Sequence, residues 1–487
     1  MTIEKIVVLL KQLTEEVQKL EKTPAAKTEY QEDSKIIALA KRYPFEGHIL
    51  VNKSDVVKKY YITTLLSIFS SVNNNNLSKE QQLFICRIIS SYDSHINIKE
   101  YITQSLKVDI KYFNNLVEVF DFDTAVCFAV DLMLLSLFGK DRIIEKECEL
   151  ISDILQLLKI NKETVLKTAN IAKAIAGQNF TQLIQLIDST DKINYSCFLA
   201  YYPENTYTSI VKNITDIKNM PGNILVVNAK ISNYHDFIDL NEYKMEKISF
   251  YNCSFNNIRG FKGSKQVLFD DCYFENNPLN MYDNGLVADI SGIKTIKKAE
   301  DNYTFIKGDR IIFKDTIFTN IRVSKNILDL TNSNIENCKF INCQGLDVPC
   351  SYLIQMNTGE IKNSVFEDCS IKTSNEDRDV TTGGIVLVTN GMIKNNKFVH
   401  CISNGQSAYG DYSEFHMQIV RAVNSKVENC FFDKAYCYSD KSYKKVVASY
   451  ILGLKNSIEH NNEFKNCGSY HYVYGECSSS HNVGTVE

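Results

Sequence analysis

Proline, long apolar runs and excess charge are all scarce in this chain. Only six of its 487 residues are proline, and none lies between Phe45 and Tyr202. No run of 18 apolar residues occurs, so the sequence contains no candidate transmembrane helix. The formal net charge is −4 and no long basic run is present, which argues against nucleic acid as a partner. We therefore expect a protein that neither inserts into a membrane nor binds nucleic acid.

The first residues also lack the features of an export signal. An acid stands at Glu4, and charged residues alternate with the apolar ones over residues 2–22, a pattern typical of an amphipathic helix. We therefore expect a cytoplasmic protein whose 15 cysteines are free thiols in a reducing environment. The apolar stripe of this helix has two candidate partners, a second copy of the chain or the domain that follows it.

Eight copies of one motif dominate the second half of the chain. Each copy centres on a phenylalanine, as in ISFYNCSFNNI at 248–258 and GEIKNSVFEDC at 359–369. The aligned residues are Phe255, Phe274, Phe318, Phe340, Phe366, Phe398, Phe432 and Phe464. Small or medium-sized side chains stand two positions before each ring, and thiols or small apolar groups usually stand three positions after it. Eleven of the 15 cysteines lie beyond residue 250, and we interpret those at repeated positions as core-filling thiols.

A second short apolar strand precedes each of the later copies, and it contains an asparagine at or near its end. These residues are Asn332, Asn357, Asn390, Asn424 and Asn456. Asparagine tolerates left-handed backbone conformations, and its amide can bond to the asparagine of the next coil. We therefore predict a structural asparagine ladder at a corner between two strands.

Strands as short as these cannot bury an apolar face alone, whereas stacked coils place every phenylalanine over the next one. The repeats therefore predict a right-handed parallel β-helix from about residue 223 onward. The longest interval between aligned rings, 44 residues from Phe274 to Phe318, leaves room for one further coil near 286–296. This arrangement resembles the pectate-lyase-like superfamily of right-handed β-helices over roughly residues 223–470.

That resemblance implies a polysaccharide lyase or hydrolase, but the residues that such enzymes need form no pattern here. Asp270 and Asp271 are adjacent, so they would point to opposite faces of a strand. Hydrolysis needs two carboxylates on one face, and we find no acidic column in the repeats. Asp377 and Asp379 fall in a polar stretch that we interpret as a solvated loop. We therefore expect no enzyme activity, no catalytic residue and no cofactor.

The first half of the chain is predicted to be helical, over residues 54–73, 78–92, 97–106, 109–120, 122–138, 144–159, 161–176 and 178–188. Two helix-turn-helix units within it share an apolar helix, a short polar turn, an isoleucine and an acid four residues later. Asp93, Ile96 and Glu100 carry this pattern in the first unit, and Lys140 stands where the second unit would have an acid. The units resemble the TerB-like (tellurite-resistance) helical family over about residues 54–190.

The acidic turn of that family implies one candidate metal site. Asp93 and Glu100 could hold a divalent cation, or they could cap the helix that follows, which is the interpretation that we favour. Lys140 argues against a symmetric centre with two metal ions. The sequence otherwise contains no residues with the spacing of metal ligands.

Together these patterns predict a multidomain α plus β protein with an all-α N-terminal domain and a solenoid. The predicted segments are a helical arm and tether at 1–45, a TerB-like domain at 46–190, a connector and β-helix cap at 191–222, and a β-helix with its tail at 223–487.

TerB-like domains resemble adaptors in bacterial stress responses. By that analogy we expect a non-enzymatic scaffold of a bacterial stress-response or anti-phage system, with protein partners or a homo-oligomer formed through residues 2–22 or the helical domain. Loops at 278–310, 371–383 and 402–415 would present binding groups. The alternatives are a carbohydrate-binding or polysaccharide-cleaving β-helix protein and a phage or surface fibre.

Overall fold

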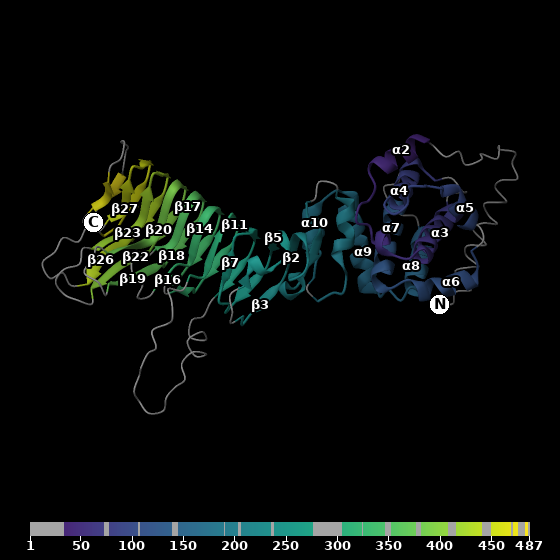
Figure 1. Ribbon diagram of the computed structural model, residues 1–487, viewed down its shortest axis with the longest axis horizontal. Helices are drawn as coiled ribbons and strands as arrows, with labels where there is room; N and C mark the ends of the chain where they lie inside the picture. The colour runs from purple at the N-terminus through teal and green to yellow at the C-terminus, as the bar shows by residue number, and fades with distance from the viewer. Residues whose placement is uncertain are drawn as a thin grey trace, which may run out of the picture. The chain divides into compact units, whose positions relative to one another are not determined.

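The chain forms two compact units, Met1–Thr208 and Ser209–Glu487, the first built from helices and the second from strands (Figure 1). The computed structural model describes residues 34–72, 77–105, 108–138, 145–188, 190–202, 206–234, 238–275, 304–323, 325–345, 352–375, 381–407, 415–440, 450–468, 471–475 and 483–485. Each unit is described by itself below.

The helical unit contains the eight helices that the apolar periodicity predicted between residues 54 and 188, with ends that differ by only a few residues. Its elements are α2 (Ser34–Arg42), η1 (Ile49–Asn52), α3 (Asp55–Val72), α4 (Lys79–Ser90), α5 (Ile98–Ser105), α6 (Ile110–Val119), α7 (Phe122–Leu137), α8 (Glu145–Leu157), α9 (Lys162–Ala176), α10 (Phe180–Gln185) and η2 (Tyr195–Tyr201). Helix α2 lies in a segment that we expected to be a tether. None of the described helices is both long and apolar enough to cross a membrane.

Local sequence explains where several of these helices begin. At α4, the Ser78 hydroxyl accepts a hydrogen bond from the Gln81 N–H (3.2 Å), and the Gln81 side chain accepts one from the Ser78 N–H (3.0 Å). Asp121 caps α7 by accepting from the Thr124 N–H (2.9 Å). Helix α7 is buried on all sides from Thr124 to Ser136, so it forms the centre of this unit.

The second unit is a stack of coils whose described strand pairs are all parallel. Its first sheet runs in the order β1 (Ser209–Val211), β2 (Gly222–Val227), β5 (Met245–Tyr251), β8 (Gln266–Asp270), β11 (Ile311–Lys314), β14 (Leu328–Glu336), β17 (Tyr352–Lys362), β20 (Thr381–Lys394), β23 (Phe415–Val423), β27 (Tyr450–Lys455) and β30 (His471–Gly475). Five short strands join it at its sides: β4 (Ile238–Asp239), β7 (Phe261–Gly263), β10 (Ile306–Asp309), β24 (Lys426–Glu428) and β28 (Ile458–His460).

Two further parallel sheets complete the coils. The second consists of β3 (Lys230–Ser232), β6 (Ser254–Asn256), β9 (Tyr273–Glu275), β12 (Ile317–Thr319), β15 (Lys339–Ile341), β18 (Val365–Glu367), β21 (Lys397–Val399), β25 (Phe431–Asp433), β29 (Glu463–Lys465) and β31 (Val483–Thr485). The third consists of β13 (Arg322–Val323), β16 (Gln344–Gly345), β19 (Ser370–Asn375), β22 (Ile402–Ser407) and β26 (Tyr436–Asp440). Stacked parallel sheets of this kind are compatible with a β-helix solenoid.

The third sheet corrects our expectation of loops at 371–383 and 402–415. Strands β19, β20 and β22 occupy much of these two segments, and β10 occupies part of 278–310. The sequences SIKTSN of β19 and ISNGQS of β22 are mostly polar and lack the repeated aromatic residue, so they gave no alternating signal.

The interval from Phe274 to Phe318 adds no rung between these two rings. Strand β9 pairs directly with β12 in the register Phe274 to Phe318, so the extra coil that we allowed for does not separate them. Residues 276–303, which connect the two coils, lie outside the described part of the chain.

One coil precedes the eight that the motif predicted. Ile231 in β3 pairs in register with Phe255 in β6, so an isoleucine takes the ring position in this first coil. Asn228 and Asn233 flank it with φ of 54° and 56°, as asparagines flank the later rings. The sequence motif did not include this coil because the motif requires phenylalanine at the ring position.

Candidate functional site

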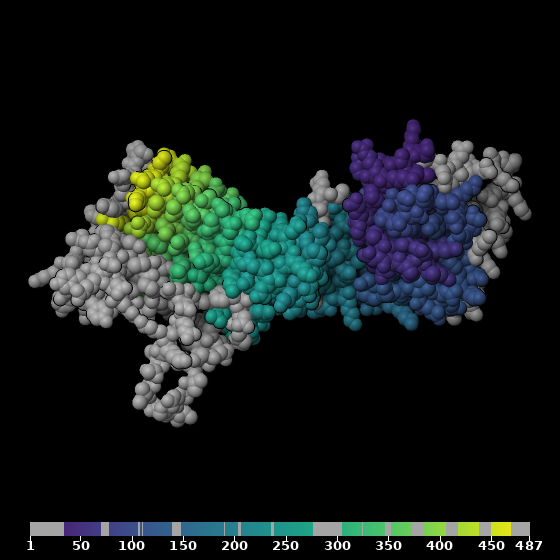
Figure 2. All heavy atoms as spheres, in the orientation of Figure 1, coloured from purple at the N-terminus to yellow at the C-terminus, as the bar shows by residue number. Residues whose placement is uncertain are grey.

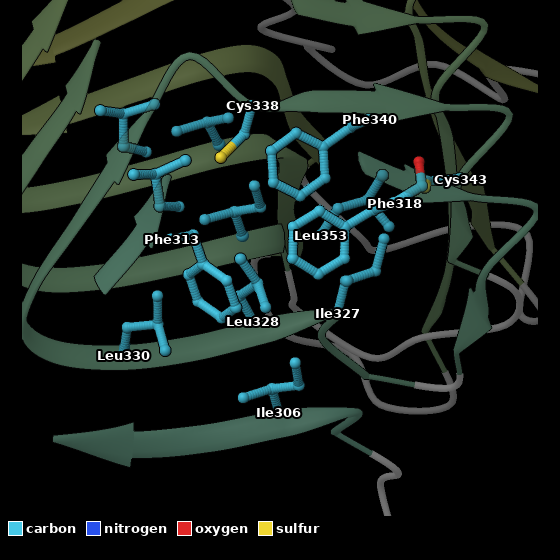
Figure 3. Close-up of a cluster of buried hydrophobic side chains, with 14 of the residues drawn as sticks. Ile306, Phe313, Phe318, Ile327, Leu328, Leu330, Cys338, Phe340, Cys343 and Leu353 are labelled. Carbon is cyan, nitrogen blue, oxygen red and sulfur yellow. The ribbon is translucent and has the colours of Figure 1, made fainter. Parts of the chain in front are cut away.

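The aligned phenylalanines form one continuous column inside the solenoid. Neighbouring rings lie 4.5–4.9 Å apart between centroids, with interplanar angles of 2–11°, and each ring is at most 1% exposed. This separation is the distance between paired strands, so backbone pairing and ring stacking share one repeat. Figure 3 shows Phe318 under Phe340, with Phe313 beside them among aliphatic side chains. Outside this interior, the coils close into a continuous surface on the face drawn in Figure 2.

A second, shorter aromatic column runs beside the first. Phe250, Phe269 and Phe313 stack at 5.0 Å with interplanar angles of 7°. The same register position continues as Ile335, Ile361, Ile393 and Val427 in the following coils.

The thiols at repeated positions fill the same interior. They are less than 9% exposed, and they are Cys253, Cys272, Cys338, Cys343, Cys369, Cys401, Cys430 and Cys467. Their hydrogen-bond acceptors are backbone carbonyls, as for Cys343, whose Sγ lies 3.6 Å from both Phe318 O and Ile341 O. Burial raises the pKa of Cys338 and Cys430 to about 12. Thiols held protonated in this way are poor nucleophiles and poor metal ligands.

Four of the five predicted ladder asparagines adopt the left-handed conformation, and one does not. Asn332, Asn390, Asn424 and Asn456 have φ of 49–55°. At the fifth corner the left-handed residue is Thr358 (φ 67°), because the pairing aligns the neighbouring Asn357 with Thr331 and Thr389. Asn357 still accepts a hydrogen bond from the Asn390 amide (3.5 Å), and Asn424 donates to Asn390 (3.3 Å).

Two further left-handed columns, which were not predicted, flank the rings wherever the flanking residues are described. Three positions before the ring stand Asn252, Asp271, Asp315, Asn337, Asn363, Asn395, Asn429 and Asn461, with φ of 49–54°. Two positions after it stand Asn257, Asn320, Asn342, Asp368, His400, Lys434 and Asn466, also with φ of 49–54°. The signal was present in the sequence, because six of the eight residues in the first of these columns are asparagine.

Charged groups gather on the solenoid surface where β8 and β11 end. Lys314 Nζ lies 3.8 Å from Asp270 Oδ2 and 3.6 Å from Asp315 Oδ2. Asp271 and Asp315 hold equivalent left-handed positions on adjacent coils, and the coils on either side of them have Asn252 and Asn337 at this position. Asp271 lies in the turn after β8 rather than in the strand, so strand alternation does not determine its direction.

The electrostatics of this cluster differ from those of an ordinary surface ion pair. Burial raises the pKa of Asp270, the Asp315 and Asp271 carboxylates raise it further, and Lys314 opposes them. The Asp270 carboxylate in turn raises the pKa of Lys314. Tyr251 pairs in register with Asp270, and the nearby Tyr273 is 37% exposed. A raised pKa favours the protonated form of a carboxyl, which is the form that a general acid needs.

A buried polar cluster lies in the core of the helical unit. The Asp131 carboxylate in α7 is 0% exposed and accepts hydrogen bonds from the hydroxyls of Tyr61 in α3 (2.7 Å) and Tyr201 in η2. The Nε2 atom of His48 lies 3.2 Å from the same carboxylate. Because the Leu50 N–H donates to Nδ1 of His48 (3.3 Å), the hydrogen-bond pattern assigns the ring proton to Nε2.

The cluster joins four segments that lie far apart in the sequence. Burial raises the pKa of the Tyr61 and Tyr201 hydroxyls, and the nearby Asp131 carboxylate raises it further, so both remain donors. His48, Tyr61, Asp131 and Tyr201 are at most 4% exposed, so a substrate would reach the carboxylate only if the unit opened. We interpret the cluster as a structural centre. The residues that bond to Asp131 are 70 or 83 residues away from it in the sequence, so no local motif could predict the cluster.

The two candidate metal ligands of the helical unit make hydrogen bonds to different partners. Asp93 accepts a hydrogen bond from the His95 N–H (2.8 Å), and Glu100 accepts one from the Gln104 amide (3.0 Å). The side chain that caps α5 is Asn97, which accepts from the Glu100 N–H (3.1 Å), so capping by Asp93 and Glu100 is corrected. In the described ranges no three His, Cys, Asp or Glu side chains are placed to hold a metal ion.

Several predicted features lie outside the described residues. They are the amphipathic segment 2–22, Lys140, and the polar stretch with Asp377 and Asp379. Comparisons with protein-family models, with curated proteins and with solved structures found no match to this chain. The proposals below therefore rest on the residues themselves.

Proposed function

We propose that this protein is a non-enzymatic scaffold, with the solenoid as a rigid binding surface and the helical unit as an adaptor for protein partners. The observation that carries the proposal is the unbroken ring column, in which Phe255 to Phe464 repeat at 4.5–4.9 Å through eight coils. A closely packed interior resists bending, so the outer side chains are displayed at fixed intervals.

The outward-facing side chains of the solenoid also carry charge. In six successive coils, the position four residues before the ring carries a charged residue: Asp270, Lys314, Glu336, Lys362, Lys394 and Glu428. Neighbouring members pair across coils, as in Lys362 with Glu336 (3.3 Å) and Lys394 with Glu428 (3.6 Å). Exposed pairs contribute only about 0–1 kcal/mol each to stability, so this row of charges of both signs is available to specify a partner.

We further propose that the solenoid is a right-handed β-helix of the pectate-lyase-like type and that the helical unit is TerB-like. On this basis the protein acts in the cytoplasm within a bacterial stress-response or anti-phage system, with protein partners or as a homo-oligomer. The support is the all-parallel stack for the first assignment, and the turn pattern of Asp93, Ile96 and Glu100 for the second. Fold-level analogy supplies the biological setting.

The test is affinity capture of the tagged full chain from its native cells, followed by light scattering of the purified product. The variant Lys362→Glu with Lys394→Glu replaces both central lysines of this row by acids, and Lys465→Glu, on an exposed position of β29, is a control for charge reversal elsewhere on the solenoid. We expect a partner or a self-assembled state that the double variant weakens and the control retains. If the wild-type chain forms neither, the scaffold proposal fails.

A carbohydrate-active protein is the second candidate, and the Asp270, Lys314 and Asp315 cluster is the observation that favours it. Exposed tyrosine beside carboxyl groups is a common way of holding a sugar ring, and Tyr273 lies on the same coil as Asp270. A glycan array combined with a reducing-end assay tests it. Turnover that disappears in Asp270→Asn and persists in Glu367→Gln, an exposed acid on another coil, would establish this candidate over the scaffold.

A further inference from the structure

Two cysteines meet in the core of the helical unit. Cys127 in α7 is 3% exposed, Cys197 in η2 is 8% exposed, and both are free thiols. Each stands four residues before a member of the buried polar cluster, Cys127 before Asp131 and Cys197 before Tyr201. Because the Tyr201 hydroxyl donates to Asp131, η2 is held against α7 next to the two thiols.

The two thiols are in direct contact. A hydrogen bond joins the side chains of Cys127 and Cys197, and both thiols lie near the Tyr201 hydroxyl. Four residues make about one turn of an α-helix, so Cys127 and Asp131 share one face of α7. This face therefore meets η2 at two successive levels, one through the carboxylate and one through sulfur.

The position of this pair suits a reversible disulfide better than the positions of the solenoid thiols do. Cys343, Cys369 and Cys401 are 0% exposed and lie on coils that backbone hydrogen bonds already join. Cys127 and Cys197 are 70 residues apart in the sequence and lie on two elements that side-chain contacts hold together. A disulfide that closes a long loop constrains the unfolded chain most.

We propose that Cys127 and Cys197 are a redox-sensitive pair, whose oxidation to a disulfide by a low-molecular-weight disulfide locks η2 onto α7. The Cys197 thiolate attacks one sulfur of the oxidant and releases a first thiolate. The Cys127 thiolate then attacks the Cys197 sulfur and releases the second. Two protein thiols are oxidised, the oxidant is reduced to two thiols, and the two protons that the cysteines lose pass to the departing thiolates.

The disulfide keeps the polar centre of the helical unit closed. In the reduced protein, η2 leaves α7 once the Tyr201 bond to Asp131 breaks, whereas in the oxidised protein a covalent bond remains. Burial raises the pKa of the Cys127 thiol, so exchange is slow while η2 is in place and proceeds when η2 is displaced. Disulfides of cytosolic proteins are usually transient ones of this sensing kind. The inference does not depend on what the solenoid binds.

The test treats the full chain with oxidised glutathione and maps its disulfides by mass spectrometry of peptides prepared without reduction. We expect a Cys127–Cys197 cross-link and a melting temperature, followed by far-UV circular dichroism, at least about 5 °C above that of the reduced protein. Cys197→Ser should lose both effects. Cys148→Ser, which removes an exposed thiol from α8 in the same unit, should retain both.

The wild-type protein decides the question even if Cys197→Ser does not fold. If Cys148 is converted to its glutathione adduct while Cys127 and Cys197 both remain reduced, the proposal is wrong. It is also wrong if the cross-link forms without raising the melting temperature, or if folded Cys197→Ser shows the same rise as wild type.

Discussion

The two units bury polar groups in opposite ways. In the helical unit, Asp131 draws hydrogen bonds from segments 70 residues away on either side, so one carboxylate holds α3, α7 and η2 together. In the solenoid, interior polar groups such as Ser364 and Asn396 bond to backbone atoms of the adjacent coil or of their own coil. One unit therefore depends on a single centre, whereas the other distributes its polar contacts coil by coil.

Removing the Asp131 carboxylate should produce the largest loss of stability. Asp131→Ala leaves two hydroxyls and the His48 Nε2–H buried without their acceptor, which we expect to cost about 5 kcal/mol and to unfold the helical unit as a whole. Urea unfolding followed by far-UV circular dichroism measures the loss. Glu118→Ala, on the exposed face of α6, should change the midpoint little. Equal stability of both variants would show that the centre is dispensable.

A cavity in the ring column should lower the free energy of unfolding nearly as much, but the destabilisation should be confined to the neighbouring coils. Phe366→Ala removes a ring stacked on two others and should cost about 3–5 kcal/mol. Hydrogen exchange should accelerate in the coils of Phe340 and Phe398 and remain slow in the helical unit. Phe464→Ala, whose ring stacks on Phe432 and faces Gly484, should cost less. Uniform acceleration along the solenoid would contradict the idea of local contacts.

The left-handed columns should give a smaller and more specific effect. Asn395 has φ of 54°, and its amide donates to Asn363 (3.1 Å). We expect Asn395→Ala to cost about 1–2 kcal/mol because alanine disfavours this conformation, and Asn395→Gly to cost less because glycine adopts it freely. Thermal melting of the two variants checks the order. A more stable alanine variant would mean that the conformation contributes little.

The smallest expected effect depends on pH. The Lys426 ammonium, which bonds to Glu428, lowers the pKa of that carboxyl, and Lys394 lowers it further. The stabilisation is therefore complete above the unfolded pKa of about 4.3 and is lost as pH falls through the folded value. Glu428→Gln should lower the urea midpoint slightly at pH 7, within the range of about 1 kcal/mol for exposed pairs, and this difference should shrink as the pH falls below the unfolded pKa. A difference that grows on acidification would have the wrong sign.

Repetition explains which parts of this fold were predictable from sequence. Helix limits followed from apolar periodicity, and the ring column followed from eight copies of one motif. The first coil was not predicted because Ile231 takes the place of the phenylalanine, and the third sheet was not predicted because its strands are mostly polar. The Asp131 cluster has no local pattern at all, since only the folded chain brings His48, Tyr61 and Tyr201 to it.

The paired left-handed residues around each ring also determine where this chain can grow. The separation between the two columns is five residues in every coil in which both are described, although successive rings are 19 to 44 residues apart along the chain. Coils therefore differ in length only in the segments that join the second left-handed residue of one coil to the first left-handed residue of the next. Engineers who need a rigid rod with interchangeable appendages could graft peptides into these intervals, because the register of the rod is set elsewhere.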